Sequence, residues 1–261
     1  MNPRSYLFVP GNRPERFDKA LSSCADAVIV DLEDAVPPDQ KDAARRIVSA
    51  WLDAAKPVVV RINAADTPWH RDDLAICRQP GVAAVMVAKA ERASTLAALQ
   101  LPVPLLPLIE SAAGFEQARA IASVHGVQRL AFGAIDFQLD LSMRAGYDEL
   151  VHFRSQLVLI SRLAGIAAPI DSPSVAMDDA EEVEREARAA RRLGFGAKLC
   201  IHPRQLAAVN RSFQPSDADI AWARRVIAIA ESSGGAAVAL DGRMIDKPVI
   251  LRAQAILAEA R

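Results

Sequence analysis

The chain has 261 residues, of which 51% are apolar and only 5% are aromatic. At roughly 150 residues per domain, this length predicts one large domain with an appended segment and excludes a small scaffold. The 31 Lys and Arg residues balance 32 Asp and Glu residues for a net charge of −1. This balance excludes a general binder of nucleic acid or of anionic membranes, because such binding needs a strongly basic surface.

The cysteines and the apolar segments indicate the cellular compartment of the protein. Cys24, Cys77 and Cys200 are odd in number and far apart, without a CxxC pair, so we expect reduced thiols. The first residues lack the long apolar segment of a secretory signal, and the apolar stretch at 101–109 is shorter than the roughly 20 residues of a membrane span. The expectation is a cytoplasmic protein with no membrane segment.

Eight short apolar segments recur along the chain and predict β-strands. Most are continuously apolar, which is typical of strands buried on both faces of a parallel sheet. Segments with helical periodicity lie between them. The predicted strands are residues 5–9, 27–32, 57–62, 84–88, 104–109, 129–132, 168–170 and 197–201, and the predicted helices include 41–54, 92–99, 115–122, 148–164 and 178–193. Eight strands alternating with helices predict an α/β fold, the closed TIM (β/α)8 barrel.

An open, doubly wound sheet is the alternative architecture. It would normally contain a glycine-rich dinucleotide loop, but Gly11 stands alone after the first predicted strand, without GxGxxG, so the barrel is favoured. Asp178 is predicted to precede a charged helix that ends at Gly194. Ser216 can cap a further helix, after which Ser-Ser-Gly-Gly at 232–235 interrupts the chain.

The domain boundary follows from these helix signals. We predict the catalytic barrel over residues 1–213. A helical C-terminal extension, ending in an amphipathic helix, is expected over residues 214–261.

Polar residues follow nearly every predicted strand, at the end where barrel enzymes carry their active sites. Glu110 ends an apolar run and Asp136 ends Phe132-Gly-Ala-Ile-Asp136. Two carboxylates at neighbouring strand ends are ligands of the kind that Mg²⁺ prefers. The alternative is structural: each carboxylate caps the following helix or pairs with Arg61 or Lys89. Sequence spacing leaves both interpretations open.

Arg61 is the third candidate at the strand ends. A guanidinium at this position can bind a carboxylate or a developing enolate; alternatively it forms an ion pair with Glu33 or Asp34. His202, which precedes a proline, is expected to fix a turn. Lys89 is expected to balance the charge of this acidic cluster rather than to act as a Schiff-base amine.

An ordered series of motifs covers nearly the whole chain: residues 4–16, 31–38, 61–63, 110–114, 132–136, 194–203 and 244–248. In their order and spacing, these motifs resemble the HpcH/HpaI aldolase and citrate lyase β-subunit family. Each motif is weak alone, but the ordered set is specific. One departure is Ala88-Lys89 after the fourth predicted strand, where the family usually has Pro-Lys.

The resemblance implies roles for individual residues. Glu110 and Asp136 match the family's Mg²⁺ ligands, and Arg61 matches its substrate arginine and is expected to be catalytic. Asp246 matches a C-terminal aspartate that acts as acid/base in a neighbouring subunit's site, so the resemblance implies that the extension over residues 214–261 packs on a neighbouring subunit. Two backbone segments complete the predicted site: the loop Pro10, Gly11, Asn12 and Arg13, where the family admits CoA, and the substrate-binding residues Gly133, Ala134 and Ile135.

The implied activity is Mg²⁺-dependent cleavage of a 3-hydroxyacyl-CoA thioester, such as citryl-, malyl- or citramalyl-CoA, to a 2-oxo acid and acetyl-CoA. Three alternatives remain: a citrate lyase β-type subunit acting on a carrier-bound citryl group, a CoA-independent 2-oxo acid aldolase, and a catalytically silent barrel. We expect a homo-oligomer, a trimer or hexamer, with no nucleic-acid or membrane partner.

Overall fold

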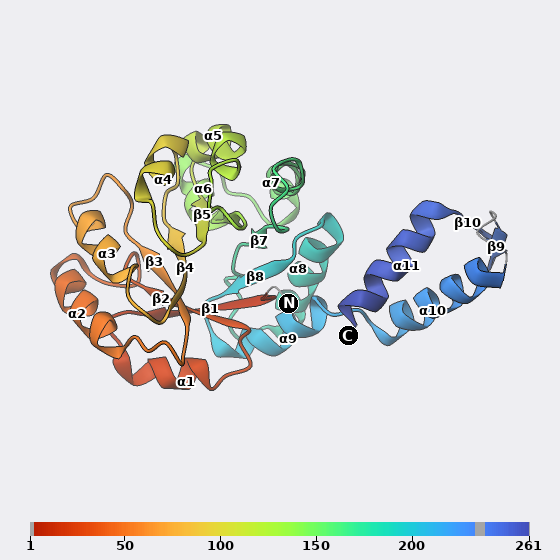
Figure 1. Ribbon diagram of the computed structural model, residues 1–261, viewed down its shortest axis with the longest axis horizontal. Coiled ribbons are helices and arrows are strands. Elements are labelled where there is room, and N and C mark those ends of the chain that lie inside the picture. Colours follow the sequence, from red (N-terminus) through yellow and green to blue (C-terminus); the bar gives the residue numbers. More distant parts are fainter. Residues whose placement is uncertain (1–2, 233–237, 261) are drawn as a thin grey trace. The chain divides into compact units, whose positions relative to one another are not determined.

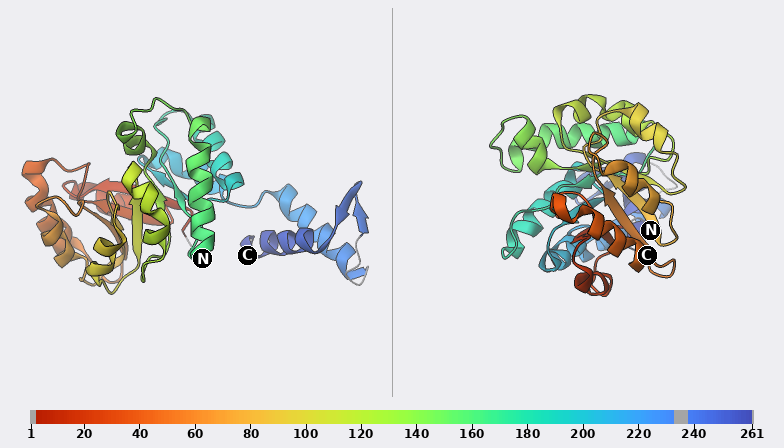
Figure 2. Two further views of the ribbon diagram at one scale, coloured as in Figure 1. Left: turned by 90° about the horizontal axis from the view of Figure 1, so that it is seen from above. Right: turned by 90° about the vertical axis from the view of Figure 1, so that its left-hand side faces the viewer.

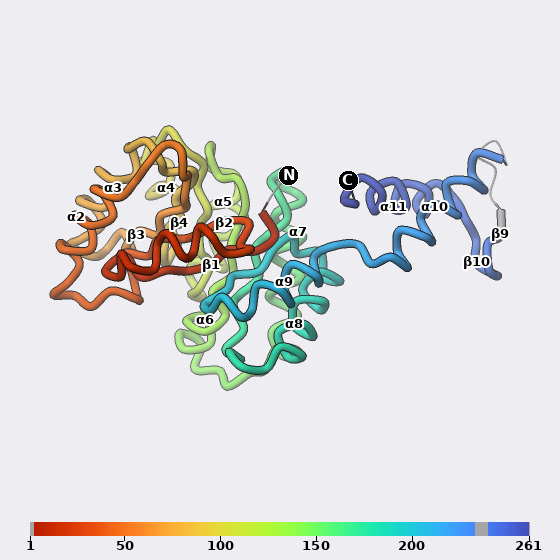
Figure 3. The backbone as a smooth tube through the Cα atoms, turned by 90° about the horizontal axis from the view of Figure 1, so that it is seen from below, coloured from red at the N-terminus to blue at the C-terminus, as the bar shows by residue number. Residues whose placement is uncertain are grey.

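The computed structural model describes residues 3–232 and 238–260 and confirms the predicted TIM barrel (Figure 1). Eight parallel strands follow one another around a closed barrel, and β1 pairs with both β2 and β8. Figure 3 shows the course of the chain through β1, β2, β3 and β4. Every predicted strand overlaps an observed one. The strands are β1 (Ser5–Pro10), β2 (Ala27–Asp31), β3 (Val58–Ile62), β4 (Val82–Val87), β5 (Leu105–Ile109), β6 (Ala131–Phe132), β7 (Ile170–Asp171) and β8 (Ala197–Cys200).

Helices surround the barrel (Figure 2). The helices named from the sequence are all present, including the seven-residue α4. The short helices α1, α3, α6 and α9, of five to seven residues, were not named, because so few residues give a weak 3.6-residue period. The helices that follow the barrel strands along the chain are α1 (Phe17–Leu21), α2 (Lys41–Trp51), α3 (His70–Ile76), α4 (Ala93–Leu99), α5 (Ala112–Ala122), α6 (Ala134–Asp140), α7 (Val151–Leu163), α8 (Ala180–Leu193) and α9 (Leu206–Ser212).

The ends of α8 refine one sequence prediction. Asp178 precedes α8 as predicted, and the cap is the next residue, Asp179, whose side chain accepts a hydrogen bond from the Glu182 N–H at 3.0 Å. The side chain of Asp178 instead pairs with Arg204. Gly194 ends the helix in the left-handed conformation, with φ of 106°, which glycine adopts at little cost.

The barrel interior is filled by apolar side chains that alternate along the strands. Ile29 of β2 and Val59 of β3 are among these buried residues, and side chains two positions further along a strand face the same side. Asp31 and Arg61 occupy those next positions, and the parallel register pairs them directly. The alternation therefore places a carboxylate and a guanidinium side by side at the carboxyl end of the barrel.

The chain divides into two compact units, residues 1–210 and 211–261. The second unit contains α10 (Asp217–Ser232), α11 (Lys247–Glu259) and an antiparallel pair of strands, β9 (Val238–Leu240) and β10 (Arg243–Ile245). Its helices and strand β10 share a small apolar core that includes Ala223, Val226, Ile245 and Ala253. The division lies three residues before the predicted boundary after 213, and the role of the extension stays a prediction. In the described part of the chain, no helix has the length and apolar character needed to cross a membrane.

Candidate active site

A cavity of about 690 Å³ lies at the carboxyl ends of the barrel strands. This is the end where TIM-barrel enzymes place their catalytic groups, and the volume suits a small-molecule site. Six of the predicted site residues line it: Pro10, Arg61, Glu110, Gly133, Ile135 and Asp136. The fold therefore gathers in one cavity residues that are up to 126 positions apart in the sequence.

Arg61 is held by carboxylates of the preceding strand and loop. Its Nε and Nη2 donate to the two oxygens of Asp31 at 2.7 and 2.6 Å, and Nη1 lies 3.0 Å from Glu33 and 3.5 Å from Asp34. The guanidinium also lies over the Phe8 ring, 4.8 Å from its centroid. The expected pairs with Glu33 and Asp34 are present, but Asp31 makes the bidentate contact, which the sequence analysis missed because strand register is not visible in sequence.

The loop after β2 is itself fixed by a buried lysine. The ammonium of Lys41 donates to the backbone carbonyls of Leu32 and Glu33, both at 2.8 Å, and to the Asn63 side chain at 2.7 Å. Asn63 in turn donates to Asp73 at 2.6 Å. These bonds orient the segment that carries Glu33, so the position of Arg61 depends on α2 as well as on β2.

Glu33 should make the stability of the metal-free protein depend on pH. Burial raises the pKa of Glu33 from 4.5 to about 7, and the attraction of Arg61 offsets this only in part. Between these two values the folded protein binds a proton that the unfolded chain has released, so the free energy of unfolding falls as pH rises. We expect the melting temperature in EDTA to fall between about pH 4.5 and pH 7, and to fall less in Glu33→Gln. Equal slopes in the two proteins would assign the effect to other groups.

Glu110 lies directly after β5 and is almost fully buried. Only 3% of the residue is exposed, and its Oε1 accepts a hydrogen bond from the Lys89 backbone N–H at 2.7 Å. Lys89 adopts a left-handed conformation, with φ of 45°, as it presents this N–H. Burial raises the pKa of Glu110 to about 8, and the charges of Glu33 and Asp136 add to the rise.

The absence of a side chain at Gly133 leaves room for the carboxylate of Glu110. A Cβ atom at residue 133 would lie 2.6 Å from both Cβ and Oε2 of Glu110, closer than non-bonded atoms approach. Any side chain at this position would displace the carboxylate. The glycine of Phe132-Gly-Ala-Ile-Asp136 is therefore explained by close packing against the site.

Asp136 belongs to the first turn of α6, not to the end of β6 as predicted from its spacing. Helix α6 begins only two residues after β6 ends, so the side chain still lines the cavity. Burial raises the pKa of Asp136, with a further contribution from the charge of Asp34, while Lys89 and Arg61 oppose the shift. Glu110 and Asp136 are close enough for their charges to interact.

The charges around the cavity suit a bound cation. Five carboxylates, those of Asp31, Glu33, Asp34, Glu110 and Asp136, interact with the charges of Arg61 or Lys89. Two further basic residues, Arg16 and Lys19, also line the cavity. Across residues 3–232 and 238–260 there is no group of three or more His, Cys, Asp or Glu side chains placed to hold a metal ion. A pair of carboxylates is nevertheless a usual protein contribution to a Mg²⁺ site, because this ion retains several of its waters.

Of the four residues in the predicted CoA loop, one lines the cavity. Pro10 lines the cavity, whereas Gly11 is packed beneath it, with its N–H bonded to the Asp31 carbonyl at 2.7 Å. Asn12 donates to Gln40 at 2.6 Å, and Arg13 is exposed and lies 3.2 Å from Glu15.

Two basic residues of the cavity wall were missed by sequence reasoning. Arg16 precedes α1, Lys19 lies within that helix, and both line the cavity. In the sequence, these two residues belong only to a short charged segment after the first predicted strand. Helix α1, which contains Lys19, was not predicted.

The other candidates occupy structural positions. His202 lines the cavity, and its ring accepts a hydrogen bond from the Arg204 N–H at 3.2 Å and caps a short 3₁₀ helix, in keeping with the expected turn. Ala134 begins α6. Asp246 belongs to the second unit, where its half-buried side chain caps α11 by accepting from the Val249 N–H at 3.3 Å. The catalytic role that the family resemblance implies for Asp246 stays a prediction.

Comparison with known proteins places the chain in a family. The family described as HpcH/HpaI aldolase/citrate lyase matches residues 4–203. A citrate lyase subunit beta-like protein of Deinococcus radiodurans is 38% identical over 277 residues, covering 98% of this chain and 96% of that protein. A (3S)-malyl-CoA thioesterase of Cereibacter sphaeroides is 35% identical over 268 residues, covering 98% and 94%.

A solved structure extends this likeness to the fold. The crystal structure of CitE from Mycobacterium tuberculosis in complex with magnesium, acetoacetate and coenzyme A has a TM-score of 0.90 and 37% sequence identity. The match covers 98% of this chain and 97% of that one. With the family match over about three quarters of its length and relatives above 30% identity, the chain belongs to the HpcH/HpaI aldolase/citrate lyase family of lyases.

Proposed function

We propose that the protein is a Mg²⁺-dependent carbon–carbon lyase that acts on a 3-hydroxyacyl-CoA thioester such as citryl-, malyl- or citramalyl-CoA. The observation that carries the proposal is the grouping of Glu110, Asp136 and Arg61 in one cavity at the carboxyl end of the barrel. The magnesium and coenzyme A of the related CitE structure support the same chemistry. The products would be a 2-oxo acid and acetyl-CoA.

Glu110 and Asp136 would hold the ion. Their carboxylates are hard oxygen ligands, and a neighbouring cation would favour the charged form that burial disfavours. When bound, Mg²⁺ supplies Lewis acidity and a fixed orientation for the oxygens of the oxo-acid half. The Lys89 N–H keeps the Glu110 carboxylate in place, so the ligand geometry is set before substrate arrives.

In the cleavage direction the 3-hydroxyl loses its proton and the C2–C3 bond breaks. Its electron pair moves onto the thioester as an enolate, and the remaining fragment becomes a 2-oxo acid. Arg61 would stabilise the developing negative charge, with the backbone N–H of Ile135 nearby. The N–H groups of Gly133 and Ala134 are already bonded to the Ile109 carbonyl and to Ser172 Oγ. Asp31 fixes the guanidinium in position, which limits reorganisation during the reaction. Asp246 would protonate the enolate at C2.

The basic side chains at the cavity entrance would bind the CoA portion. Arg16 and Lys19 line the cavity and are largely exposed, as suits contacts to mobile phosphate groups. The net charge of −1 provides no general attraction for a polyanion, so local contacts must hold it. Pro10 would form the apolar wall beside the thioester arm.

The second unit would complete the site of a neighbouring subunit in a homotrimer or homohexamer. Co-assembly of Asp136→Ala with Asp246→Ala is expected to restore activity, because a barrel with intact Asp136 can then receive an intact Asp246. Random mixing would restore about a quarter of wild-type sites. Native mass spectrometry verifies the mixed oligomers, and turnover is measured on the same sample. Mixed oligomers of verified composition that stay inactive would exclude action across the interface.

A second candidate function is thioester hydrolysis, which the relative named (3S)-malyl-CoA thioesterase favours. The deciding experiment incubates purified protein and Mg²⁺ with citryl-, malyl- and citramalyl-CoA and identifies the products by mass spectrometry. A lyase releases acetyl-CoA with oxaloacetate, glyoxylate or pyruvate. A thioesterase releases free CoA with the intact hydroxy acid. An EDTA-treated sample tests the need for a metal.

The same assay separates the remaining alternatives. Cleavage of the free hydroxy acids without CoA would indicate a CoA-independent aldolase. A protein that leaves all three CoA esters intact but cleaves a carrier-bound citryl group would be a citrate lyase β-type subunit. Turnover of one CoA ester to acetyl-CoA by the purified homo-oligomer supports the proposal and excludes an obligatory carrier complex.

A further inference from the structure

Ser172 lines the cavity opposite Arg61 and was not among the predicted site residues. It directly follows β7, and only 1% of the residue is exposed. In the ring of eight strands, β7 is four places from β3, which carries Arg61. Glu110 and Asp136, which follow β5 and β6, lie between these two positions around the barrel.

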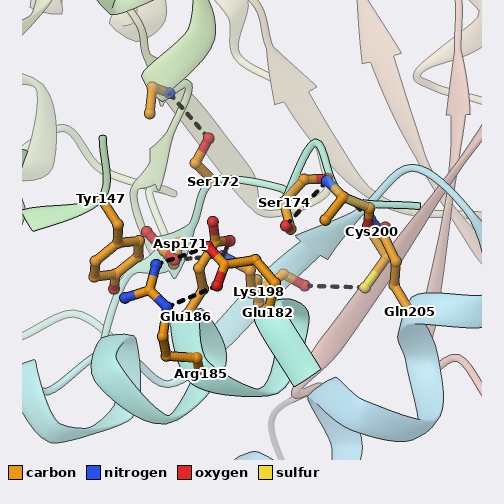
Figure 4. A network of polar contacts seen from close by, with 12 residues as sticks. Tyr147, Asp171, Ser172, Ser174, Glu182, Arg185, Glu186, Lys198, Cys200 and Gln205 are labelled. Atoms are coloured by element: carbon orange, nitrogen blue, oxygen red, sulfur yellow. Dashed lines mark hydrogen bonds and ion pairs between the residues drawn. The ribbon is translucent and has the colours of Figure 1, made fainter. Parts of the chain in front are cut away.

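The neighbouring Asp171 holds Ser172 in place. Its carboxylate is fully buried and is bonded to Arg154 and Lys198, each at 2.8 Å, on the outer side of the strand. Figure 4 shows Asp171 beside Lys198. Lys198 also lies 3.3 Å from Glu186 of α8. Because side chains alternate along a strand, anchoring Asp171 toward the helices directs Ser172 toward the cavity.

The hydroxyl of Ser172 has one unused hydrogen. Its Oγ accepts the backbone N–H of Ala134 at 3.1 Å (Figure 4). A serine hydroxyl accepts through its lone pairs and donates through its single hydrogen, and no acceptor for that hydrogen is present among the described residues. A buried donor without an acceptor is costly, and this one faces a cavity. A ligand oxygen would satisfy it.

We propose that Ser172 binds the carboxylate of the 2-oxo acid half of the substrate through its hydroxyl hydrogen. The proposal rests on the lyase function proposed above. Citryl-, malyl- and citramalyl-CoA yield different oxo acids, but all of these carry a carboxylate. Ser172 therefore binds the group that the three candidate substrates share.

The charge distribution around the cavity favours this side for the carboxylate. Asp31, Glu33 and Asp34 surround Arg61 and occupy its guanidinium. A substrate carboxylate next to them would meet like charges. On the β7 side, the carboxylate of Asp171 is neutralised by Arg154 and Lys198, and the Ser172 hydroxyl provides a donor.

The test compares wild type with Ser172→Ala in the presence of Mg²⁺. Binding of glyoxylate, pyruvate and oxaloacetate is measured by calorimetry, independently of turnover. The variant is expected to bind each of them at least about tenfold more weakly, because a hydrogen bond to a charged group is lost. In the condensation assay, the KM for the oxo acid should rise by a similar factor, with the KM for acetyl-CoA within about twofold of wild type. Ser172→Thr, which keeps the hydroxyl, should restore binding.

Two controls make the result specific. Ser174→Ala removes a buried serine two residues away whose Oγ accepts from the Ala176 N–H, and it should leave oxo-acid binding unchanged. Mn²⁺ affinity, measured by electron paramagnetic resonance, should be retained in Ser172→Ala. A parallel loss of metal affinity would show that Ser172 acts only by holding α6, and would overturn the proposal.

The remaining outcomes separate this proposal from the proposed function. Wild-type turnover of a CoA thioester with unchanged oxo-acid binding in Ser172→Ala would overturn the role of Ser172 and leave the lyase function standing. A wild-type protein that neither binds any of the three oxo acids nor cleaves any of the three thioesters would overturn the lyase function itself, and the role of Ser172 with it.

Discussion

Asp136→Ala is expected to lower kcat/KM for the preferred CoA thioester by at least about 10³-fold while the protein stays folded. Removing one of two carboxylate ligands eliminates several kcal/mol of charge stabilisation, and each 1.36 kcal/mol corresponds to a factor of ten in rate. Stability should be retained, because burial and the charge of Asp34 disfavour the ionised form of Asp136. Steady-state kinetics at saturating Mg²⁺ and thermal unfolding followed by circular dichroism measure the two effects.

Asp140→Asn provides the matched control. Asp140 lies one turn further along α6, is exposed, and accepts the Ala112 N–H at 2.7 Å. The amide oxygen of asparagine can still accept that bond, so activity should be close to wild type. A variant Asp136→Ala that keeps its activity, or wild-type turnover that continues in EDTA after metal removal, would contradict the assignment of Asp136 as a ligand.

Arg61→Met is expected to abolish activity and also to destabilise the fold by about 3–5 kcal/mol, because it leaves the buried carboxylates of Asp31 and Glu33 without their cation. The loss of stability and the loss of activity have the same origin. The Arg61 guanidinium neutralises buried carboxylates in the folded protein, and we propose that it also stabilises the negative charge that develops in the reaction. Urea unfolding monitored by fluorescence gives the stability change. Arg61→Lys restores a charge but not the planar pair of bonds to Asp31, so it should recover more stability than activity.

Arg45→Met separates these effects from the general loss of an arginine. Arg45 is half-buried and donates to Asp73 at 3.0 Å, and it does not line the cavity. Its replacement should reduce stability with little change in kcat/KM. The proposed role of Arg61 would be wrong if Arg61→Met turned over substrate like wild type once corrected for the folded fraction.

Much of the candidate site could be predicted because its signals are local. Glu110 ends a continuous apolar run, and a carboxylate in that place must be compensated. Gly133 and Asp136 lie in one short motif, and Arg61 interrupts an apolar strand. Their presence in the cavity follows from the barrel, in which every strand delivers its carboxyl end to the same face.

The remaining parts of the site depend on contacts between distant segments. Asp31 and Arg61 are paired by strand register, and a shift of one residue would have turned either side chain to the opposite face. Ser172 faces the cavity because its neighbour Asp171 is anchored on the outer side. Lys19 lines the cavity only because a five-residue helix, too short for a periodic signal, follows the first strand.

The sequence by itself determined the eight-stranded barrel, the family, and the acidic residues at the strand ends, since each is written in the order and spacing of nearby residues. Only the tertiary structure decided which carboxylate holds Arg61, which basic residues line the cavity, and which serine hydroxyl faces it. The physical reason is barrel closure: it sets register and side-chain direction across segments that are tens of residues apart, and no local pattern encodes either.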